Sequence, residues 1–254
     1  MDSYKVIAII PARMGSSRLP GKPLADICGR PMILRVVERV KDMDCIQGLA
    51  IATDSLEIAE CVEAHGYRAI MTDPTHPSGS DRIAQAAAIM GLDPDDIVVN
   101  IQGDQPFVEP AAIKTIIEAL ETDQDASVAT AACPLTESEA RDPNRVKVVI
   151  DGSGRALYFS RSLIPFDRDG KLKPEKRPYL RHLGLYAYRM DFLQGFVKME
   201  PGRLESIERL EQLRILENGY GIAVRIVQSA PIDVDTAEDL EKARLLFKAV
   251  SQAG

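Results

Sequence analysis

The sequence predicts an α/β fold, a doubly wound and mostly parallel sheet with an antiparallel elaboration. Through the first half of the chain, short β-branched runs alternate with amphipathic stretches, which is the pattern of a parallel sheet covered by helices on both faces. Near residue 130 this alternation gives way to paired β-runs around a glycine turn. We interpret residues 1–254 as a single domain with an inserted antiparallel subregion at about 130–200.

Each strand expected in the first half is a short apolar run that is followed by a helical pattern. The expected strands are 6–10, 48–52, 69–71 and 97–101. The expected helices are 31–40, 56–64, 81–90 and 111–120. Pro31 suits the first turn of its helix because its fixed φ is already helical.

The second half combines a hairpin with longer helices. Runs 146–151 and 156–159 flank Gly152-Ser153-Gly154, which predicts a hairpin. Further strands are expected at 183–188 and 223–227, and further helices at 204–217 and 236–249. The core stripe expected in the 204–217 helix is Leu204, Ile207, Leu210, Leu213 and Leu216. We interpret the charged run 167–177 as a mobile loop.

The composition argues against several classes of function. The net charge of −7 and the sequence pI near 5.1 argue against a nucleic-acid polymer as a partner. The cysteines and histidines show no spacing typical of a disulfide framework or a zinc site, so the thiols are expected to be reduced. No apolar run approaches the ~20 residues of a membrane span, and we expect a cytoplasmic protein.

The first candidate site is the loop PARMGSSRLPGKPL, which directly follows the first expected strand. A P-loop has about four residues between its first glycine and its Gly-Lys pair, followed by Ser or Thr. Here five residues, 16–20, separate Gly15 from Gly21, and proline follows Lys22. Because proline offers neither a hydroxyl nor an N–H, we expect the loop to bind an anion with the side chains of Arg13, Arg18 and Lys22.

Two carboxylates are candidates for holding a metal–phosphate, and each has a simpler alternative. Asp104 lies in NIQGDQP, directly after a buried strand, although Gly-Asp-Gln-Pro is also an acceptable turn. Asp235 lies in DVDTAE, where Asp235 or Thr236 can cap the last helix and Glu238 can complete a capping box. A cap and a metal ligand are compatible because a carboxylate has two oxygens.

Other polar stretches allow both a structural and a functional interpretation. Arg161 lies beside aromatic residues on or near an expected apolar strand, and a ligand carboxylate would supply the partner that a buried arginine needs. His182 lies among aromatic residues, where a lone histidine is usually structural. ATDS at 52–55 fits a plain helix start, and HPSGSDRIAQ at 76–85 fits an N-cap or a contact with base and ribose.

The order and spacing of these motifs, from residue 6 to about 245, resemble the 3-deoxy-manno-octulosonate cytidylyltransferase (CMP-Kdo synthetase) family. The motifs are PARMGSSRLPGKPL, TDSLEIAE, HPSGSDRIA, VNIQGDQP, DPNRVKVV, ALYFSRSLIPFDRD, YLRHLGLYAY, LESIERLEQLR and DVDTAEDLEKAR. The resemblance implies a Rossmann-like nucleotidyltransferase fold and a cytosolic, usually homodimeric bacterial enzyme of lipopolysaccharide core synthesis. Such an enzyme transfers CMP from CTP to the anomeric hydroxyl of 3-deoxy-D-manno-octulosonate (Kdo) and releases pyrophosphate, with magnesium.

The resemblance also implies roles for individual residues. Arg13, Arg18 and Lys22 would hold the CTP triphosphate, and Ser80 and Arg82 would lie near the cytidine. Asp104 and Asp235 would bind Mg²⁺ and would be catalytic together with Arg13 and Lys22. The implied sugar site is Gln102, Arg161, His182, Tyr186, Glu211 and Gln212. The subregion at about 130–200 would serve sugar binding and dimerisation.

The sequence departs from the family pattern at several positions, which leaves the identity of the sugar open. Met14 and Gly15 stand where the family commonly has an aromatic residue and Ala, and Gln105 stands where Glu is common. GRLESIERLEQLR also resembles the enzyme that activates 8-amino-3,8-dideoxy-manno-octulosonate, which is the alternative substrate, with a sialic acid more remote. A non-catalytic nucleotide-sugar sensor is the alternative of another class, and the two metal carboxylates argue against it.

Overall fold

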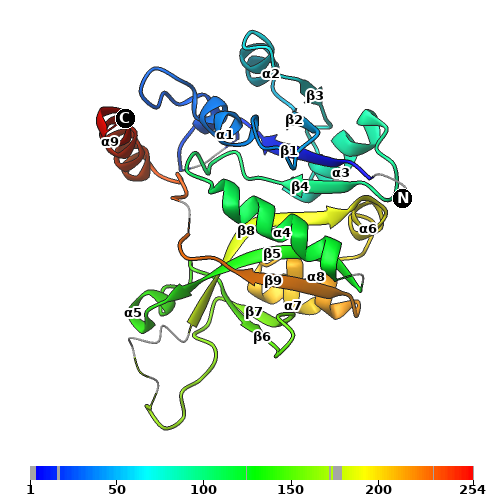
Figure 1. The fold of residues 1–254 in the computed structure, drawn as a ribbon, viewed down its shortest axis with the longest axis vertical. Helices are drawn as coiled ribbons and strands as arrows, with labels where there is room; N and C mark the ends of the chain where they lie inside the picture. Colours follow the sequence, from blue (N-terminus) through cyan, green and yellow to red (C-terminus); the bar gives the residue numbers. More distant parts are fainter. Residues whose placement is uncertain are drawn as a thin grey trace. The chain divides into compact units, whose positions relative to one another are not determined.

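The computed structural model describes residues 4–15, 18–123, 125–171, 173, 179–230 and 232–253 (Figure 1). The chain divides into two compact units, residues 1–111 with 231–254, and residues 112–230. Ser16 and Ser17 of the candidate anion loop lie outside the described residues, and so do residues 172 and 174–177 of the expected mobile loop. Among the residues that are described, no helix is long and apolar enough to cross a membrane.

The first unit holds a parallel sheet in the strand order β3-β2-β1-β4. Its strands are β1 (Val6–Ala12), β2 (Gly48–Thr53), β3 (Ala69–Met71) and β4 (Ile97–Asn100). Its helices are η1 (Lys22–Leu24), α1 (Met32–Val40), α2 (Leu56–Glu63), α3 (Gly79–Met90) and α9 (Ala237–Ala253). The doubly wound α/β fold and the strands and helices expected for this unit are confirmed.

The topology of this sheet creates a ligand-binding crevice. Strands β1 and β4 are almost entirely buried apolar runs, as in sheets that are covered on both faces. The strand order reverses between them, so right-handed crossovers place α1 and α2 on one face and α3 on the other. Open α/β sheets bind ligands at the carboxyl ends of the strands where the order reverses. In this unit those are the ends of β1 and β4.

A small core cluster positions the segment that leads into α9. Val234 is fully buried with Ile27, Met32, Leu240 and Ala243. This packing places α9 beside α1 (Figure 1). It therefore brings the chain around residue 235, far away in sequence, into the unit that contains β1 and β4.

The second unit is mainly antiparallel. Its strands are β5 (Ala126–Leu135), β6 (Lys147–Ile150), β7 (Ala156–Ser160), β8 (Tyr179–Arg189) and β9 (Gly221–Ile226). Strand β8 is antiparallel to β5 and β6, β6 and β7 form the expected hairpin, and β9 runs parallel to β5. Its helices are α4 (Pro110–Thr122), α5 (Glu137–Ala140), α6 (Met190–Phe196), α7 (Arg203–Glu208) and α8 (Gln212–Glu217).

The expected helix over 204–217 is wrong, because the chain breaks there into α7 and α8. Arg209 between them has a left-handed φ of 54°, which interrupts the helix. The fold-back is held by Arg214, whose Nε and Nη2 donate to both carboxylate oxygens of Glu205 at 2.7 and 2.6 Å. The expected core stripe is also partly wrong, since Ile207 is 66% exposed whereas Ile215 is buried.

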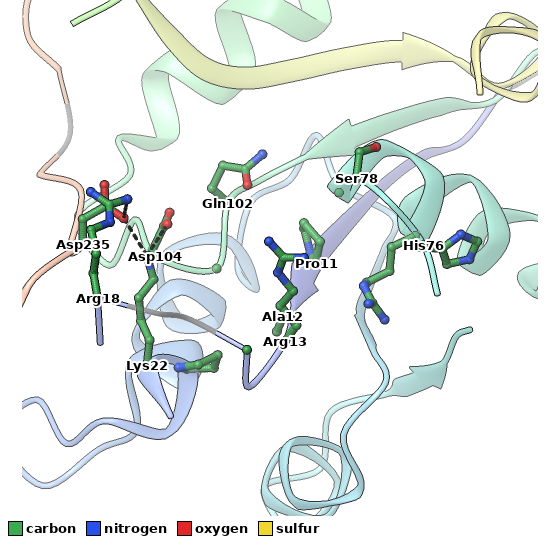
Figure 2. A pocket seen from close by; sticks show the side chains of 15 residues that line it. Pro11, Ala12, Arg13, Arg18, Lys22, His76, Ser78, Gln102, Asp104 and Asp235 are labelled. Atoms are coloured by element: carbon green, nitrogen blue, oxygen red, sulfur yellow. Dashed lines mark hydrogen bonds and ion pairs between the residues drawn. The ribbon is translucent and has the colours of Figure 1, made fainter. Parts of the chain in front are cut away.

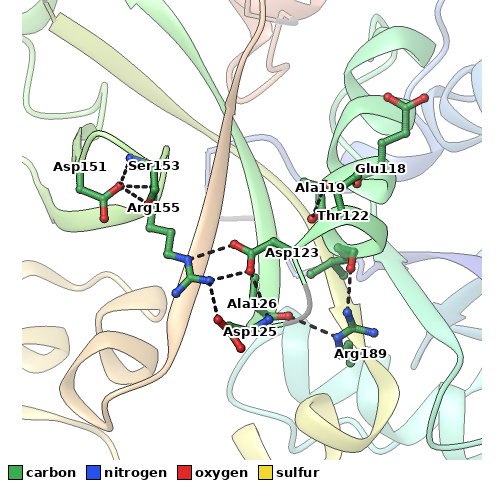
Figure 3. A network of polar contacts seen from close by, with 11 residues as sticks. Glu118, Ala119, Thr122, Asp123, Asp125, Ala126, Asp151, Ser153, Arg155 and Arg189 are labelled. Carbon is green, nitrogen blue, oxygen red and sulfur yellow. Dashed lines mark hydrogen bonds and ion pairs between the residues drawn. The ribbon is translucent and has the colours of Figure 1, made fainter.

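A charged clamp ties the β6–β7 hairpin to the end of α4 (Figure 3). Arg155 donates from Nε and Nη2 to both carboxylate oxygens of Asp123, at 3.0 and 2.6 Å. Asp151 shapes the turn by accepting hydrogen bonds from the backbone N–H groups of Ser153 and Arg155. The hydrogen bonds from Arg155 hold the pKa of Asp123 below its ordinary 3.8.

This clamp predicts a pH-dependent contribution to stability. A carboxyl group whose pKa is lowered on folding stabilises the protein above its ordinary pKa, here 3.8, and that contribution is lost as the pH falls through the lowered value. Arg155→Met should lower the thermal unfolding midpoint at neutral pH, and its difference from wild type should shrink in acid. Arg141→Met, which removes a surface pair with Glu137, is the control and should have little effect. A difference for Arg155→Met that does not change with pH would contradict this account.

Candidate functional site

A cavity of about 380 Å³ lies at the carboxyl ends of β1 and β4, within the first unit (Figure 2). It is lined by the loop after β1, the start of α3, the loop after β4, and Asp235. The labelled lining residues in Figure 2 are Pro11, Ala12, Arg13, Arg18, Lys22, His76, Ser78, Gln102, Asp104 and Asp235. Seven of the residues predicted from the sequence line this one cavity: Arg13, Arg18, Lys22, Arg82, Gln102, Asp104 and Asp235.

The loop after β4 reaches the cavity because of a glycine. A Cβ on Gly103 would lie 2.8 Å from the backbone oxygen of Pro11, too close for any side chain. The backbone N–H of Gln105 donates to the oxygen of Gln102 at 3.2 Å, which closes a turn with Gly103 and Asp104 at its centre. The turn and the ligand interpretation of Asp104 are therefore both compatible with the structure.

Lys22 lies between two carboxylates that come from distant parts of the sequence. Its Nζ is 2.6 Å from Oδ2 of Asp104 and 2.9 Å from Oδ1 of Asp235. Nη2 of Arg18 is 3.1 Å from the same Asp235 oxygen (Figure 2). Burial alone lowers the pKa of Lys22, but Asp104 and Asp235 outweigh it and raise the pKa above its ordinary value. Lys22 is therefore a permanent cation in this site.

The cap of α9 is Thr236 and not Asp235. Oγ1 of Thr236 accepts from the N–H of Asp239, and the Asp239 carboxylate accepts from the Thr236 N–H, at 3.2 and 3.1 Å. The capping partner is thus Asp239, and the expectation for Glu238 is wrong because Glu238 is one position too early. Capping by Thr236 leaves the Asp235 carboxylate to face Lys22 and Arg18.

Arg82 lines the cavity as an almost fully buried cation. Its Nη2 donates to Asp54 at 2.8 Å and its Nη1 to Oγ1 of Thr72 at 2.5 Å. Ser78 caps α3 by accepting from the N–H of Asp81 at 3.2 Å, so the N-cap interpretation of this stretch is confirmed. Ser80 is buried and is not among the residues that line the cavity.

His76 is a cavity residue that the sequence interpretation did not single out. Oε1 of Gln85 accepts from the N–H of Asp73 at 2.8 Å, which fixes that atom as the oxygen, and His76 Nε2 lies 2.7 Å from it. His76 Nε2 therefore carries the proton in the neutral ring. Its position at the start of the HPSGSDRIA motif could have indicated a place in the cavity. A search for metal-ligand spacing among the histidines does not detect such a residue.

Most residues of the implied sugar site gather in the second unit. His182 on β8 has ring contacts with Phe159 and Tyr186 at centroid distances of 4.9 and 5.3 Å, and Gln212 Nε2 lies 3.4 Å from its Nδ1. Burial, with a smaller effect of Arg181, lowers the pKa of His182 to about 3, so the ring is neutral at physiological pH. Burial, Tyr188 and Glu211 raise the pKa of Tyr186 well above its ordinary value, so its hydroxyl keeps its proton. Gln102 alone of this set lies in the first unit.

Arg161 lies one residue beyond the end of β7, near the strand as expected. It is half-buried, and its partners are backbone carbonyls. Nε donates to Glu208 at 2.8 Å, Nη1 to Pro143 at 3.2 Å, and Nη2 to Arg209 at 3.4 Å. Each terminal nitrogen of a guanidinium carries a second N–H, so these contacts orient the group and leave it able to bind an anion.

Comparisons with known proteins agree with this geometry. The cytidylyltransferase family matches residues 7–226. The chain is 51% identical to the 3-deoxy-manno-octulosonate cytidylyltransferase of Syntrophobacter fumaroxidans, over 93% of this chain and 94% of that relative. It is 48% identical to the enzyme of the same name from Polynucleobacter necessarius subsp. necessarius, over 95% of each chain.

Solved structures show the same similarity. A CMP:2-keto-3-deoxy-manno-octonic acid synthetase in complex with CTP has a TM-score of 0.91 and 40% identity, over 96% of this chain and 99% of that chain. A 4-diphosphocytidyl-2C-methyl-D-erythritol synthase, at 13% identity and a TM-score of 0.65 over 96% and 99% of the two chains, shares the fold alone.

Proposed function

This chain belongs to the cytidylyltransferase family and, within it, to the 3-deoxy-manno-octulosonate cytidylyltransferases, and from this membership we propose its reaction. The protein is a nucleotidyltransferase that transfers CMP from CTP to the anomeric hydroxyl of Kdo and releases pyrophosphate. The observation that carries the proposal is the cavity in which cationic side chains surround two carboxylates. CTP, Kdo and Mg²⁺ together should give pyrophosphate and CMP-sugar in equal amounts, and omission of any one should abolish both.

The cavity suits the charge of the triphosphate. CTP brings about four negative charges, and catalysis of such a transfer depends on in-line positioning and charge neutralisation. Arg13, Arg18 and Lys22 supply the cations, and Lys22 is held in place by its two carboxylate partners. In the reaction the anomeric oxygen bonds to the α-phosphorus while the bond from that phosphorus to the bridging oxygen breaks. Pyrophosphate leaves with the electron pair of the broken bond, and the proton of the sugar hydroxyl is released to solvent. Arg82 and the start of α3 line the same cavity and would contact the cytidine.

The same residues fit a magnesium ion. Carboxylate oxygens are its preferred protein ligands, and Asp104 and Asp235 already share a cation, the Lys22 ammonium. In the described part of the chain no group of three or more His, Cys, Asp or Glu is placed to hold a metal. The pair of carboxylates, Asp104 and Asp235, suits Mg²⁺, which usually takes one or two carboxylates together with substrate phosphates. We propose that Asp104 and Asp235 hold it, and when bound it would offset negative charge at the α-phosphorus.

The sugar would be recognised by residues of the second unit. His182, Tyr186, Glu211 and Gln212 supply neutral polar groups and one carboxylate, which suit hydroxyl groups, and Arg161 suits the sugar carboxylate. Substrates that keep the carboxylate but differ at the eighth carbon would use the same arginine. The 8-amino analogue therefore remains the alternative sugar.

Arg161→Ala is expected to raise the KM for the sugar by about 10- to 100-fold, the usual scale for loss of a charge-assisted contact, with little change in the KM for CTP. Initial rates at varied sugar and CTP concentrations measure both constants. Arg203→Ala, an exposed arginine at the start of α7, is the matched control. A larger rise in the KM for CTP than for the sugar would contradict the carboxylate role.

We further propose that the enzyme acts in the cytoplasm as a homodimer and supplies CMP-Kdo for lipopolysaccharide core synthesis. Similarity to the family supports this proposal. A nucleotide-sugar sensor, the alternative of another class, would not need the pair of carboxylates that Lys22 bridges.

A further inference from the structure

A side-chain hydrogen bond joins the two loops that carry Asp104 and Asp235. Nε2 of Gln105 donates to Oδ1 of Asp233 at 2.8 Å. We propose that Gln105 and Asp233 are positioning residues whose hydrogen bond sets the separation of the Asp104 and Asp235 carboxylates. This inference rests on the proposed role of those two carboxylates as metal ligands.

The Gln105 side chain is held by its N–H alone. It is 5% exposed, and among the described residues no donor reaches its Oε1. A buried amide oxygen without a donor is destabilising, so an amide at this position is unfavourable unless its N–H makes a hydrogen bond. The side-chain N–H of Gln105 makes this hydrogen bond to Asp233.

The Gln105–Asp233 bond is one of two adjacent hydrogen bonds between the two loops. The backbone N–H of Val234 donates to the oxygen of Asp104 at 3.0 Å, directly beside the bond between Gln105 and Asp233. Asp104, adjacent to Gln105, and Asp235, two residues after Asp233, both contact Lys22. A change in the Gln105–Asp233 distance therefore changes the geometry of the neighbouring carboxylates.

Each of the two loops is anchored by contacts of its own. Val234 is fully buried in the core cluster beneath α9, which anchors the loop that carries Asp235. On the other loop, the backbone of Gln105 joins two successive turns. Its N–H donates to the backbone oxygen of Gln102 at 3.2 Å, and its backbone oxygen accepts from the N–H of Val108 at 3.0 Å. Displacement of Gln105 would carry the adjacent Asp104 with it. The side-chain bond to Asp233 therefore couples two separately anchored loops, each of which carries one of the carboxylates.

A swap of hydrogen-bond polarity tests the pair without removing either side chain. Q105E places an acceptor against the Asp233 acceptor, and D233N then restores a donor from the opposite side. The readout is Mn²⁺ binding, followed by the electron paramagnetic resonance signal of free Mn²⁺, with thermal unfolding measured in parallel. We expect Q105E to weaken Mn²⁺ binding about 10-fold or more when Asp233 is present, the usual effect of losing an outer-shell partner. In a chain that already carries D233N, the same change should alter binding by no more than about twofold.

Q47E is the matched control, because Gln47 is exposed and its Oε1 only accepts from the backbone N–H of Val6, which a glutamate oxygen also does. Its Mn²⁺ binding should equal that of wild type. Equal binding by Q105E and wild type would overturn the inference, and so would a loss that D233N does not rescue. A lowered unfolding midpoint with intact Mn²⁺ binding would also overturn it, by showing a merely structural role. Failure of wild type to bind Mn²⁺ would overturn the proposed metal site together with this inference, so the two failures are distinguishable.

Discussion

Replacement of Asp104 or Asp235 by alanine is expected to abolish pyrophosphate release while leaving the fold intact. The two carboxylates are the only protein groups proposed to hold the metal, and loss of a Lewis-acid contribution of several kcal/mol lowers the rate by about 1,000-fold or more. The fold should survive because both side chains border the cavity, with 27% and 37% of their surfaces exposed, and Lys22 retains one partner in either variant. Initial rates of pyrophosphate release and thermal unfolding midpoints measure the two effects separately.

Asp95→Ala is the matched control for this pair of variants. Asp95 is an exposed aspartate that precedes β4, at the opposite end of the strand from the cavity, and its removal changes the charge by the same amount. Its activity should equal that of wild type. Turnover close to wild type in Asp104→Ala or Asp235→Ala would contradict the metal assignment.

Lys22→Ala is expected to weaken the use of CTP by about 1.5–3 kcal/mol, or 10- to 150-fold in kcat/KM for CTP. The change removes a cation from the proposed triphosphate site and leaves Asp104 and Asp235 without the ammonium that lies between them. On the proposed assignment both losses would act on the nucleotide, so the KM for the sugar should change much less. Lys41→Ala, which removes an exposed lysine paired with Asp42, is the control. An unchanged kcat/KM for CTP would contradict the assignment of Lys22 to the CTP site.

The elements of the first unit are predictable because local pattern and tertiary environment agree there. Strands β1 and β4 are uninterrupted apolar runs, and the structure buries them. Residues that follow such strands lie at one edge of a parallel sheet, which is why the sequence alone indicates that Lys22 and Asp104 share a site.

The second unit shows where local pattern fails. Strand β5 (Ala126–Leu135) was missed because its alanine-rich run lacks the alternation and β-branched content that distinguish a strand from a buried helix. The break between α7 and α8 depends on a bidentate contact between Arg214 and Glu205, which no periodicity reveals. The hydrogen bond from Nε of Arg161 to the backbone carbonyl of Glu208 is likewise not revealed by any sequence periodicity.

In the candidate site too, residues with a clear local pattern are predictable from the sequence, and tertiary contacts are not. Arg13, Arg18 and Lys22 are evident from a loop that fails the P-loop spacing, and Asp104 from its place after β4. Asp235 is ambiguous in the sequence because the residues around it also fit a helix cap, and only the bond between Thr236 and Asp239 shows which residue caps. The pairing of Arg82 with Asp54 joins residues that are 28 positions apart, and sequence alone gives no reason to connect them.

The central claim is that this chain activates an acidic eight-carbon sugar with CTP, and the most direct measurement is pyrophosphate release from CTP and Mg²⁺ with three sugars compared side by side. The sugars are Kdo, its 8-amino analogue and a sialic acid. We predict the highest kcat/KM with Kdo, CMP-sugar formed in equal amount to pyrophosphate, and the same dependence on Asp104 and Asp235. Release with the sialic acid alone, or no release with any of the three, would contradict the account.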